Sequence, residues 1–294
     1  MTNPFRGIGG IKVITGESLA EHTSFHIGGP AQYFVRVYSR KGLRAVLRKI
    51  KANRMPYFII GAGTNLLVMD RGYRGVVIKL GGIFKSMALY GQEFRCGAGL
   101  LIKDFMDEVI KAGYSGAEFM AGIPGTLGGA VKGNAGAFGN SISDILERIT
   151  IMDEKGMEYV RTRDEIEFSY RRSDIDNHEI IIGVDVLLSK GRPRTILAMV
   201  RRNLKARNQK HPKGYSAGSF FKNPPGHAAG KLIEEFGLKG LSIGGAEVSQ
   251  QHGNYIINLG DARATDVMAL EREIRKKVRA KTGIDLEREV QLLK

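Results

Sequence analysis

Apolar and polar positions alternate with two different periods along this chain, and the changes of period predict its elements. Between residues 31 and 38 apolar side chains recur at every second position, which is typical of a strand. Between 43 and 51 they recur at the three- and four-residue spacing of an amphipathic helix, and a similar stripe over 266–281 ends before Gly283. Further helices are expected at 101–112, 195–207 and 229–236, and further strands at 57–60, 76–80, 148–152, 157–161, 180–188, 219–222, 255–258 and 286–292.

The mixture of helices and strands predicts an α+β fold. A chain of 294 residues suggests two domains, each able to bury a core. Pro212, Gly214 and Gly218 interrupt the periodic pattern after the helix expected at 195–207. We therefore expect one domain over residues 1–207 and a smaller one over 208–294.

The charge balance predicts anionic partners. Lys and Arg number 45 against 30 Asp and Glu, a formal net charge of +15, which favours nucleic acid, acidic lipid or a phosphorylated small molecule. The basic residues are scattered along the chain, aromatic residues make up 8%, and Trp is absent. A nucleic-acid-binding module would interleave aromatic with basic side chains, so phosphorylated small molecules are the favoured partners.

Cellular location is indicated only indirectly. The one cysteine, Cys96, excludes an intramolecular disulfide and is interpreted as a packed strand residue in a protein of a reducing compartment. Residues 1–10 lack the apolar segment of a signal peptide, and no apolar run approaches the roughly 18 residues of a membrane span. We expect a cytoplasmic monomer without a membrane span.

The 39 glycines are clustered rather than periodic. The loop Gly61–Leu66 follows an expected strand, yet it matches neither the dinucleotide fingerprint nor a P-loop, so a plain turn and a phosphate site both remain open. The loops Gly122–Ala130 and Asn134–Gly139 favour a ligand lying against the backbone. His22 and His26 lie beside Gly28, Gly29 and Pro30, which disfavour a helix there, and no metal site is expected.

Several segments resemble, in the same order, the UDP-N-acetylenolpyruvoylglucosamine reductase family, and they span nearly the whole chain. Single motifs of this kind are ambiguous, whereas their ordered combination is specific. They are Thr23-Ser24-Phe25-x-Ile27-Gly28-Gly29-Pro30-Ala31, Gly61-x-Gly63-Thr64-Asn65-Leu66-Leu67-Val68, Gly122–Ala130 with Asn134-Ala135-Gly136, Ser169-Tyr170-Arg171, Gly218–Pro224, and Leu286-Glu287-Arg288-Glu289-Val290.

The resemblance implies a fold and a cofactor. It implies an FAD-binding domain like that of vanillyl-alcohol oxidase, built from two α+β subdomains over about 1–82 and 83–207. A substrate-binding domain follows, and the last strand contributes to the active site. The short stretch 188–195 makes the chain similar to the shorter, second type of the family. Non-covalent FAD is expected against Gly28, Gly29, Gly61, Ala62, Gly63, Thr64, Asn65, Leu66, Gly122, Ile123, Pro124, Gly125, Thr126, Gly128, Gly129, Asn134, Ala135 and Gly136.

The activity that the resemblance implies is reduction of UDP-N-acetylglucosamine enolpyruvate to UDP-N-acetylmuramate, a step of peptidoglycan synthesis, with NADPH as the hydride donor. Arg171 is expected to stabilise the substrate carboxylate and the growing enolate, since its planar fork suits a carboxylate. Ser219 is expected to be the proton donor, and Glu289 an acid or an orienting group.

The substrate's remaining contacts are expected from Tyr170, Arg207, Lys210, Asn223 and Gln251, with His252 as an alternative to Gln251. Of the two basic residues, Lys210 is favoured for the diphosphate.

Two positions depart from the family pattern: Thr64 stands where Ser is common, and Gln291 where a basic residue is common. The competing interpretation within this fold class is an FAD-dependent oxidase, which the Ser219 motif disfavours.

Overall fold

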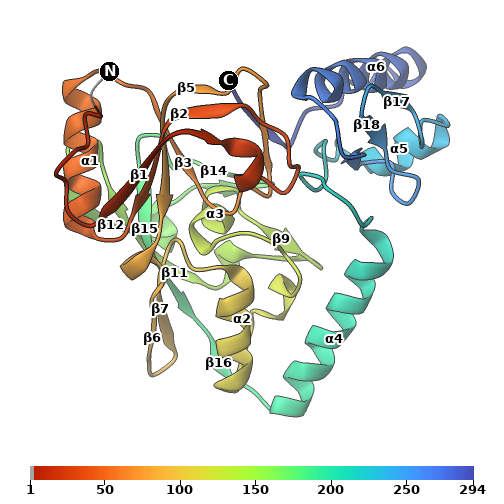
Figure 1. The fold of residues 1–294 in the computed structure, drawn as a ribbon. Coiled ribbons are helices and arrows are strands. Elements are labelled where there is room, and N and C mark those ends of the chain that lie inside the picture. Colours follow the sequence, from red (N-terminus) through yellow and green to blue (C-terminus); the bar gives the residue numbers. More distant parts are fainter. Residues whose placement is uncertain (1–2) are drawn as a thin grey trace. The chain divides into compact units, whose positions relative to one another are not determined.

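The computed structural model describes residues 3–294, which form two compact units. Unit 1 comprises the residues up to Thr15, then Tyr33–Ala62 and Gly75–Lys205. Unit 2 comprises Gly16–Gln32, Gly63–Arg74 and Ala206–Lys294. Each unit therefore draws on several stretches of the sequence, as the colours of Figure 1 show.

The first sheet, mostly in unit 1, is built from the N-terminal part of the chain. Its strand order is β1-β2-β5-β3, and β3 runs parallel to β5 with Tyr57 opposite Val76. Helix α1 (Arg40–Ala52) begins where the hydroxyl of Ser39 accepts a hydrogen bond of 3.1 Å from the backbone N–H of Gly42. The strands are β1 (Ile11–Ser18), β2 (Pro30–Val37), β3 (Tyr57–Ile60) and β5 (Tyr73–Leu80).

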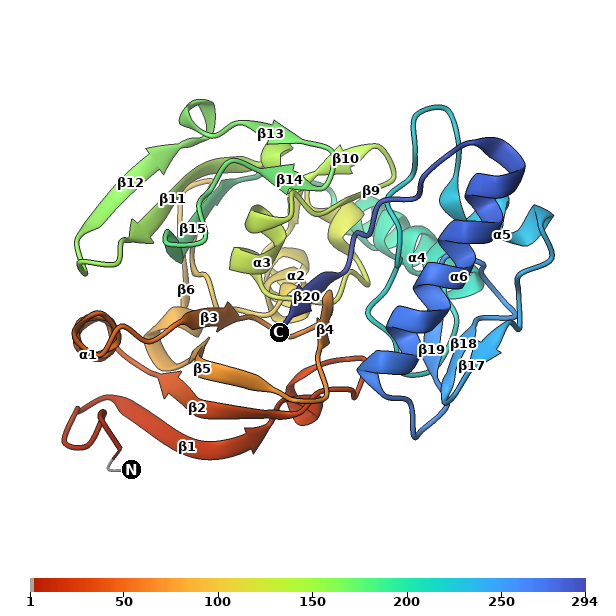
Figure 2. The ribbon, with the colours of Figure 1, turned by 90° about the horizontal axis from the view of Figure 1, so that it is seen from above.

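The second sheet of unit 1 is antiparallel throughout, in the order β12-β11-β15-β7-β6, visible in Figure 2. The expected hairpin is confirmed, since Met152 of β11 pairs with Glu158 of β12. These strands are β6 (Met87–Tyr90), β7 (Glu93–Gly97), β11 (Leu146–Met152), β12 (Glu158–Thr162) and β15 (Ile180–Leu187). Smaller pairs are β8 (Tyr114–Ser115) with β16 (Ser189–Lys190), β9 (Gly136–Ala137) with β10 (Asn140–Ser141), and β13 (Phe168–Ser169) with β14 (Arg172–Ser173).

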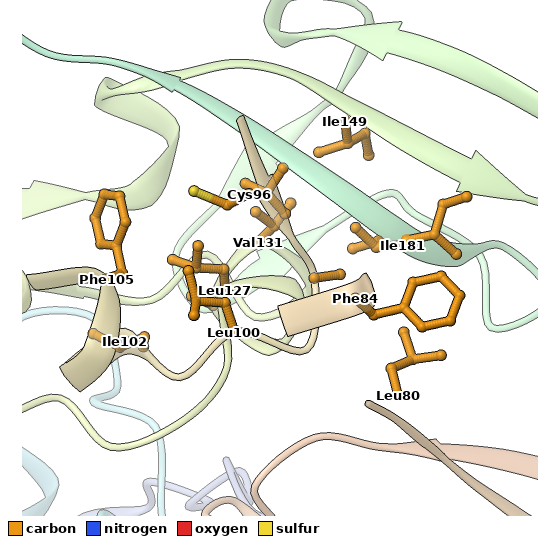
Figure 3. Packing of buried hydrophobic residues seen from close by; sticks show 14 of the residues in the cluster. Leu80, Phe84, Cys96, Leu100, Ile102, Phe105, Leu127, Val131, Ile149 and Ile181 are labelled. Carbon is orange, nitrogen blue, oxygen red and sulfur yellow. The ribbon is translucent and has the colours of Figure 1, made fainter. Parts of the chain in front are cut away.

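Two helices, α2 (Ile102–Lys111) and α3 (Leu127–Lys132), contribute apolar side chains to the core of unit 1. Figure 3 shows Phe84, Phe105 and Leu127 packed near Cys96 of β7. Burial, with the nearby charge of Asp185, raises the pKa of the Cys96 thiol to about 12. Cys96 is thus a packed strand residue, as expected, and not a nucleophile.

Unit 2 packs two helices with a three-stranded sheet. Helix α6 (Ala264–Thr282) buries Val267, Leu270, Ile274 and Val278 completely, the stripe expected from the sequence. It ends at Gly283, whose φ of 73° is the left-handed conformation that favours glycine. The other elements are α5 (Ala229–Glu235), the sheet of β17 (Ser242–Ile243), β18 (Ala246–Val248) and β19 (Ile256–Asn258), and the parallel pair of β4 (Leu66–Val68) with β20 (Gln291–Leu293).

Helix α4 spans Pro193–Lys210, and short 3-10 turns complete the fold. The turns are Leu19–His22, Gly82–Lys85, Glu118–Met120, Ile142–Asp144 and Arg163–Glu165. Within residues 3–294, no helix combines the length and the apolar character that crossing a bilayer requires. The functional division at residue 208 stays a prediction.

Two expected strands differ from the structure. Residues 219–222 form isolated bridges, of Ser219 with Tyr255 and of Phe221 with Arg288, instead of a strand. Phe220 and Phe221 are both buried, each 1% exposed. The last strand covers only Gln291–Leu293 instead of 286–292. The α+β class is confirmed.

Candidate functional site

The loop after β3 begins in unit 1 with a glycine that the packing of the chain requires. A Cβ at Gly61 would lie 2.7 Å from the side-chain oxygen of Thr126, too close for any other residue. Thr126 in turn caps α3, because its hydroxyl accepts the N–H of Gly129 at 3.3 Å. The two glycine-rich loops of unit 1 therefore contact each other at Gly61 and Thr126.

The rest of this loop lies in unit 2, where glycine again permits close approach. Gly63 has a φ of 67°, and a Cβ there would lie 2.0 Å from the carbonyl oxygen of His22. Its own carbonyl accepts the N–H of Ser24 at 3.1 Å. Gly28 and Gly29 are equally confined, because their Cβ atoms would meet Val68 at 2.8 Å and the Asp70 carbonyl at 2.1 Å.

Asn65 ties the loop to the C-terminal segment of unit 2. Its side-chain amide donates to the carbonyl of Glu289 at 3.3 Å, and its own carbonyl accepts the N–H of Gln291 at 3.1 Å. Ala62 and Thr64 are half-buried and Leu66 is buried in β4. Asn65, expected to contact the cofactor, thus also positions the backbone that carries Glu289.

The first turn of α3 is occupied by the protein itself. The N–H groups of Leu127 and Gly128 donate to the carbonyls of Leu100 and Ala98, at 2.9 and 2.8 Å. The N–H of Gly129 donates to Thr126. These amides are unavailable to a ligand phosphate, so any ligand must instead contact the exposed atoms of the loop.

Those exposed atoms belong to Gly122, Pro124 and Gly129. Gly122 and Gly125 have φ values of 74° and 141°, backbone conformations that favour glycine. Ile123 is half-buried and donates its N–H to the Met120 carbonyl at 2.9 Å. A flat ligand lying on this loop would meet mostly backbone.

Asn134 presents the clearest unmet polar group in unit 1. Its side-chain nitrogen donates to the carbonyl of Ser169 at 3.0 Å, whereas its side-chain oxygen is buried and has no hydrogen-bond partner within residues 3–294. A buried acceptor without a partner is costly, so a donor on a ligand would stabilise it. The flavin ring carries such an N–H, and this residue therefore fits FAD. The N–H of its neighbour Ala135 donates to the Ala130 carbonyl at 2.8 Å, and a Cβ at Gly136 would lie 2.5 Å from the Asn140 carbonyl oxygen.

Arg171 occupies the tip of the hairpin between β13 and β14. Ser169 pairs with Arg172, so Tyr170 and Arg171 form the two-residue turn, and Arg171 adopts a φ of 57°. Such a conformation costs a non-glycine residue about 1–3 kcal/mol and is often associated with functional sites. The Arg171 guanidinium lies 5.3 Å from the ring centroid of Tyr170, which is exposed.

The same hairpin is anchored to the end of α3. The hydroxyl of Ser173 donates to the carbonyl of Lys132 at 2.9 Å, and the Lys132 ammonium donates to the carbonyl of Ile175. Together with the bond from Asn134 to Ser169, these contacts hold Arg171 and Asn134 close together in unit 1.

Ser219 is half-buried in unit 2, where the next residues hold it in place. Ser219 forms an isolated bridge with Tyr255. The backbone of Phe221 exchanges two hydrogen bonds with the Asn254 side chain, of 2.9 Å to Oδ1 and 2.8 Å from Nδ2. The Asn254 side chain thereby supplements the backbone hydrogen bonds that this segment makes with Asn254, Glu287 and Glu289.

Glu289 lies beside the segment that carries Ser219, Phe220 and Phe221. Its N–H donates to the carbonyl of Phe220 at 2.9 Å, and its half-buried carboxylate acts on Tyr255. Burial is the main cause that raises the pKa of Tyr255 and Glu289 raises it further, whereas the Ser219 hydroxyl and the charge of Arg207 lower it. Ser219 and Glu289 thus lie on segments that contact each other through the backbone of Phe220.

The basic residues near the end of α4 surround a histidine. Arg207 is half-buried and Lys210 is exposed. Burial, followed by the charges of Arg207, His252 and Lys210, lowers the pKa of His211 to about 4. His211 follows α4 directly, since its N–H donates to the Arg207 carbonyl at 2.9 Å.

Asn223 and Gln251 have structural contacts that their expected role in substrate binding does not explain. The Asn223 side-chain oxygen accepts the N–H of Ala229 at 3.0 Å, at the start of α5. The Gln251 amide donates to the Gln209 carbonyl at 3.0 Å, and so joins its loop to the end of α4. Both side chains remain exposed, so their contacts with substrate stay predictions.

Tyr255 and His211 were absent from the candidates derived from the sequence. The phenol of Tyr255 hydrogen-bonds with Nδ1 of His211. The available signals were a tyrosine at the start of an apolar run and a histidine inside a basic group, and neither pattern alone indicates a site.

Family models match two parts of this chain. The model of the FAD binding domain matches residues 31–162, and that of the UDP-N-acetylenolpyruvoylglucosamine reductase C-terminal domain matches residues 209–293.

Relatives cover almost the whole chain. A UDP-N-acetylenolpyruvoylglucosamine reductase of Lachnoclostridium phytofermentans is 41% identical over 96% of this chain and 93% of its own length. One from Clostridioides difficile is 40% identical over 94% of this chain and 92% of its own.

Solved structures agree. UDP-N-acetylenolpyruvylglucosamine reductase from Thermus caldophilus superposes with a TM-score of 0.84 and 38% identity, over 97% of this chain and 99% of that one. The 6-hydroxy-D-nicotine oxidase of Arthrobacter nicotinovorans has a TM-score of 0.50 and 20% identity, over 65% of this chain and 44% of that one, and shows likeness of fold alone. The expected flavoprotein fold class is confirmed.

Proposed function

Because this chain belongs to the UDP-N-acetylenolpyruvoylglucosamine reductase family, we propose that it reduces UDP-N-acetylglucosamine enolpyruvate to UDP-N-acetylmuramate, with FAD bound and NADPH as hydride donor. The observation that carries the chemistry is the grouping of Ser219, Glu289 and Tyr255 in unit 2. Ser219 pairs with Tyr255, and the backbone of Glu289 bonds to Phe220, the residue after Ser219, so a hydroxyl and a carboxylate come from adjacent segments.

FAD supplies the hydride when it is bound, and unit 1 has atoms that fit it. The exposed backbone of Gly122 and Gly129 would contact the ring, and the unmet oxygen of Asn134 would accept its N–H. Because the amides of Leu127 and Gly128 are already paired, the FAD diphosphate must find its donors elsewhere in the expected loops.

Arg171 would hold the substrate carboxylate. Hydride addition to the vinyl group places negative charge on the carbon next to that carboxylate, and a planar guanidinium can stabilise both oxygens as the charge grows. The Tyr170 ring beside it limits the orientations of the guanidinium. The positive φ of Arg171 supports a functional role, because nothing in a two-residue turn requires arginine at that position.

Ser219 would give the proton to that carbon. A serine hydroxyl is a weak acid, but an enolate-like carbon is a strong base, so transfer is favourable once the hydride has arrived. Glu289 would orient the reacting groups around Ser219. Arg207 and Lys210 would neutralise the substrate diphosphate, which also accounts for part of the net charge of +15.

An FAD-dependent oxidase of the same fold class is the second candidate. It is supported only by likeness of fold at 20% identity, against 41% for the reductase relatives. The use of NADPH in preference to NADH, the monomeric state and the cytoplasmic location remain predictions.

An anaerobic absorbance experiment on the purified protein tests the proposal. The flavin band should bleach when NADPH is added and return when UDP-N-acetylglucosamine enolpyruvate follows. Bleaching without return on addition of the sugar would reject the substrate. Rapid return with oxygen alone, and flavin retained after denaturation, would favour the oxidase.

A further inference from the structure

We propose that Tyr255 and His211 are positioning residues that act through Ser219, forming a hydrogen-bonded relay that returns a proton to its hydroxyl as the substrate carbon is protonated. The inference rests on the proposed function, in which Ser219 is the proton donor. It assigns a purpose to two polar side chains that the reaction described above does not use.

The geometry places the three groups in a row within unit 2. The Tyr255 phenol hydrogen-bonds with Nδ1 of His211. On the other side, Ser219 and Tyr255 pair in an isolated antiparallel bridge, which places their side chains on the same face, and the relay needs their hydroxyl groups to meet there. Between Tyr255 and His211 the ring planes are 87° apart and the centroids 5.3 Å apart, so the phenol meets the edge of the imidazole.

Packing alone does not explain the phenol. Tyr255 is 4% exposed, and a phenylalanine would fill the same space without a buried hydroxyl to satisfy. Its backbone is paired independently, with the His252 carbonyl at 3.1 Å and the Ser249 N–H at 2.8 Å. The hydroxyl therefore contributes only through the polar groups beside it, while His211 at the end of the row is half-buried and reaches the surface.

Burial is the main cause that lowers the pKa of His211, and Arg207, His252 and Lys210 lower it further, so that the imidazole is neutral. Burial is also the main cause that raises the pKa of Tyr255. A neutral imidazole offers one N–H and one lone pair, and a phenol can both donate and accept. A proton can therefore pass along the row, whereas a permanently cationic histidine could only donate.

Water supplies the proton that balances this step. As the C=C bond of the substrate opens, the terminal carbon takes the hydride and the adjacent carbon takes the Ser219 proton, so that two C–H bonds form. The Ser219 oxygen takes the Tyr255 proton in the same step, because a phenol is far more acidic than a serine hydroxyl even when burial raises its pKa. The Tyr255 oxygen takes the proton of His211 Nδ1, and the imidazole takes one from water at Nε2.

The test separates the two half-reactions in an anaerobic stopped-flow instrument. Tyr255→Phe should leave flavin reduction by NADPH within about twofold of wild type and slow reoxidation by the enolpyruvyl sugar about 10–100-fold. The solvent deuterium isotope effect on reoxidation should change as well. In a Ser219→Ala background, Tyr255→Phe should cause no further slowing, because the relay acts only through that hydroxyl.

Tyr114→Phe is the matched control. Tyr114 is also 4% exposed, and its phenol hydrogen-bonds with the Gly91 carbonyl in unit 1, so removing this oxygen should leave both half-reactions unchanged. His211→Gln, which keeps a polar side chain, should reproduce the direction of the Tyr255→Phe effect. If Tyr255→Phe fails to fold, which loss of NADPH reduction would reveal, His211→Gln carries the same test.

The outcomes distinguish this inference from the proposed function. Equal slowing by Tyr255→Phe with and without Ser219, or an unchanged reoxidation rate in a protein that Ser219→Ala slows severely, would overturn the relay and leave the proton donor in place. Normal reoxidation in Ser219→Ala would reject the proton donor itself.

Discussion

The side-chain amide of Asn134 donates a hydrogen bond of 3.0 Å to the carbonyl of Ser169, two residues before Arg171. One end of this amide therefore fixes the hairpin that carries the candidate carboxylate-binding arginine. The other end, the unmet oxygen, is available to a ligand. Cofactor binding and the position of Arg171 are thus expected to depend on the same residue.

Asn134→Ala should weaken FAD binding by about tenfold, as expected for the loss of about 1.4 kcal/mol of hydrogen bonding. Alanine also tolerates the φ of 40° at this position less well than asparagine. Quenching of flavin fluorescence on titration of the apoprotein measures the affinity. Asn140→Ala, in an exposed position of the neighbouring strand β10, should bind FAD as the wild type does.

Arg171→Lys should slow reoxidation of the flavin by the enolpyruvyl sugar about 10²–10³-fold, because lysine keeps the charge but loses the fork. Reduction by NADPH should change little. Single-turnover absorbance at the flavin band measures both steps. The adjacent exposed residue provides a control, since Arg172→Lys should leave both rates intact, and a similar loss there would argue against a specific role for Arg171.

Gly63→Ala should lower the free energy of unfolding by about 3 kcal/mol or more, because its methyl group would lie 2.0 Å from the His22 carbonyl. Gly226→Ala is the matched change: Gly226 has a similar φ of 74° with no atom within 4 Å of the new methyl group, so it should cost about 1–2 kcal/mol. Urea denaturation of the two variants gives the difference, and equal losses would contradict the steric explanation.

Acid should destabilise the protein partly through His211. Its folded pKa of about 4 lies below the ordinary value of 6.5, so the unfolded chain binds a proton at this group before the folded chain does. This contribution to stability is present above about pH 6.5 and is lost as the pH falls towards 4. The urea midpoint of His211→Gln should therefore depend less on pH in this window than that of wild type. Burial also lowers the pKa of His252, so this residue should still contribute to the pH dependence of stability in the variant.

The elements with a clear period were predictable from the sequence, and those held by side chains were not. The stripe of α6 and the strand β3 follow from local spacing. The segment 219–222 resembled a strand, but the Asn254 side chain, distant in sequence, supplies part of its pairing. The expected helix at 43–51 begins three residues earlier because Ser39 caps it.

Of the candidate site, too, only the residues within local motifs were predictable from the sequence. The motif around Ser219 and the Arg171 turn are visible in the sequence, whereas Tyr255 and His211 meet only after folding. The glycine clusters were interpreted as ligand loops, but Gly28, Gly29, Gly61 and Gly63 are already required by contacts with the chain itself. Sequence cannot distinguish a backbone close to a ligand from one close to another segment.

The parallel pairing of β4 with β20 has a consequence for biosynthesis. Leu67 in β4 is completely buried, yet the core around it is completed by residues from Ala217 to Val290, and its partner strand is Gln291–Leu293. On the ribosome, β4 emerges long before those residues are made. Its apolar side chains therefore stay exposed to solvent or to a chaperone until the residues from Ala217 to Leu293 have been translated.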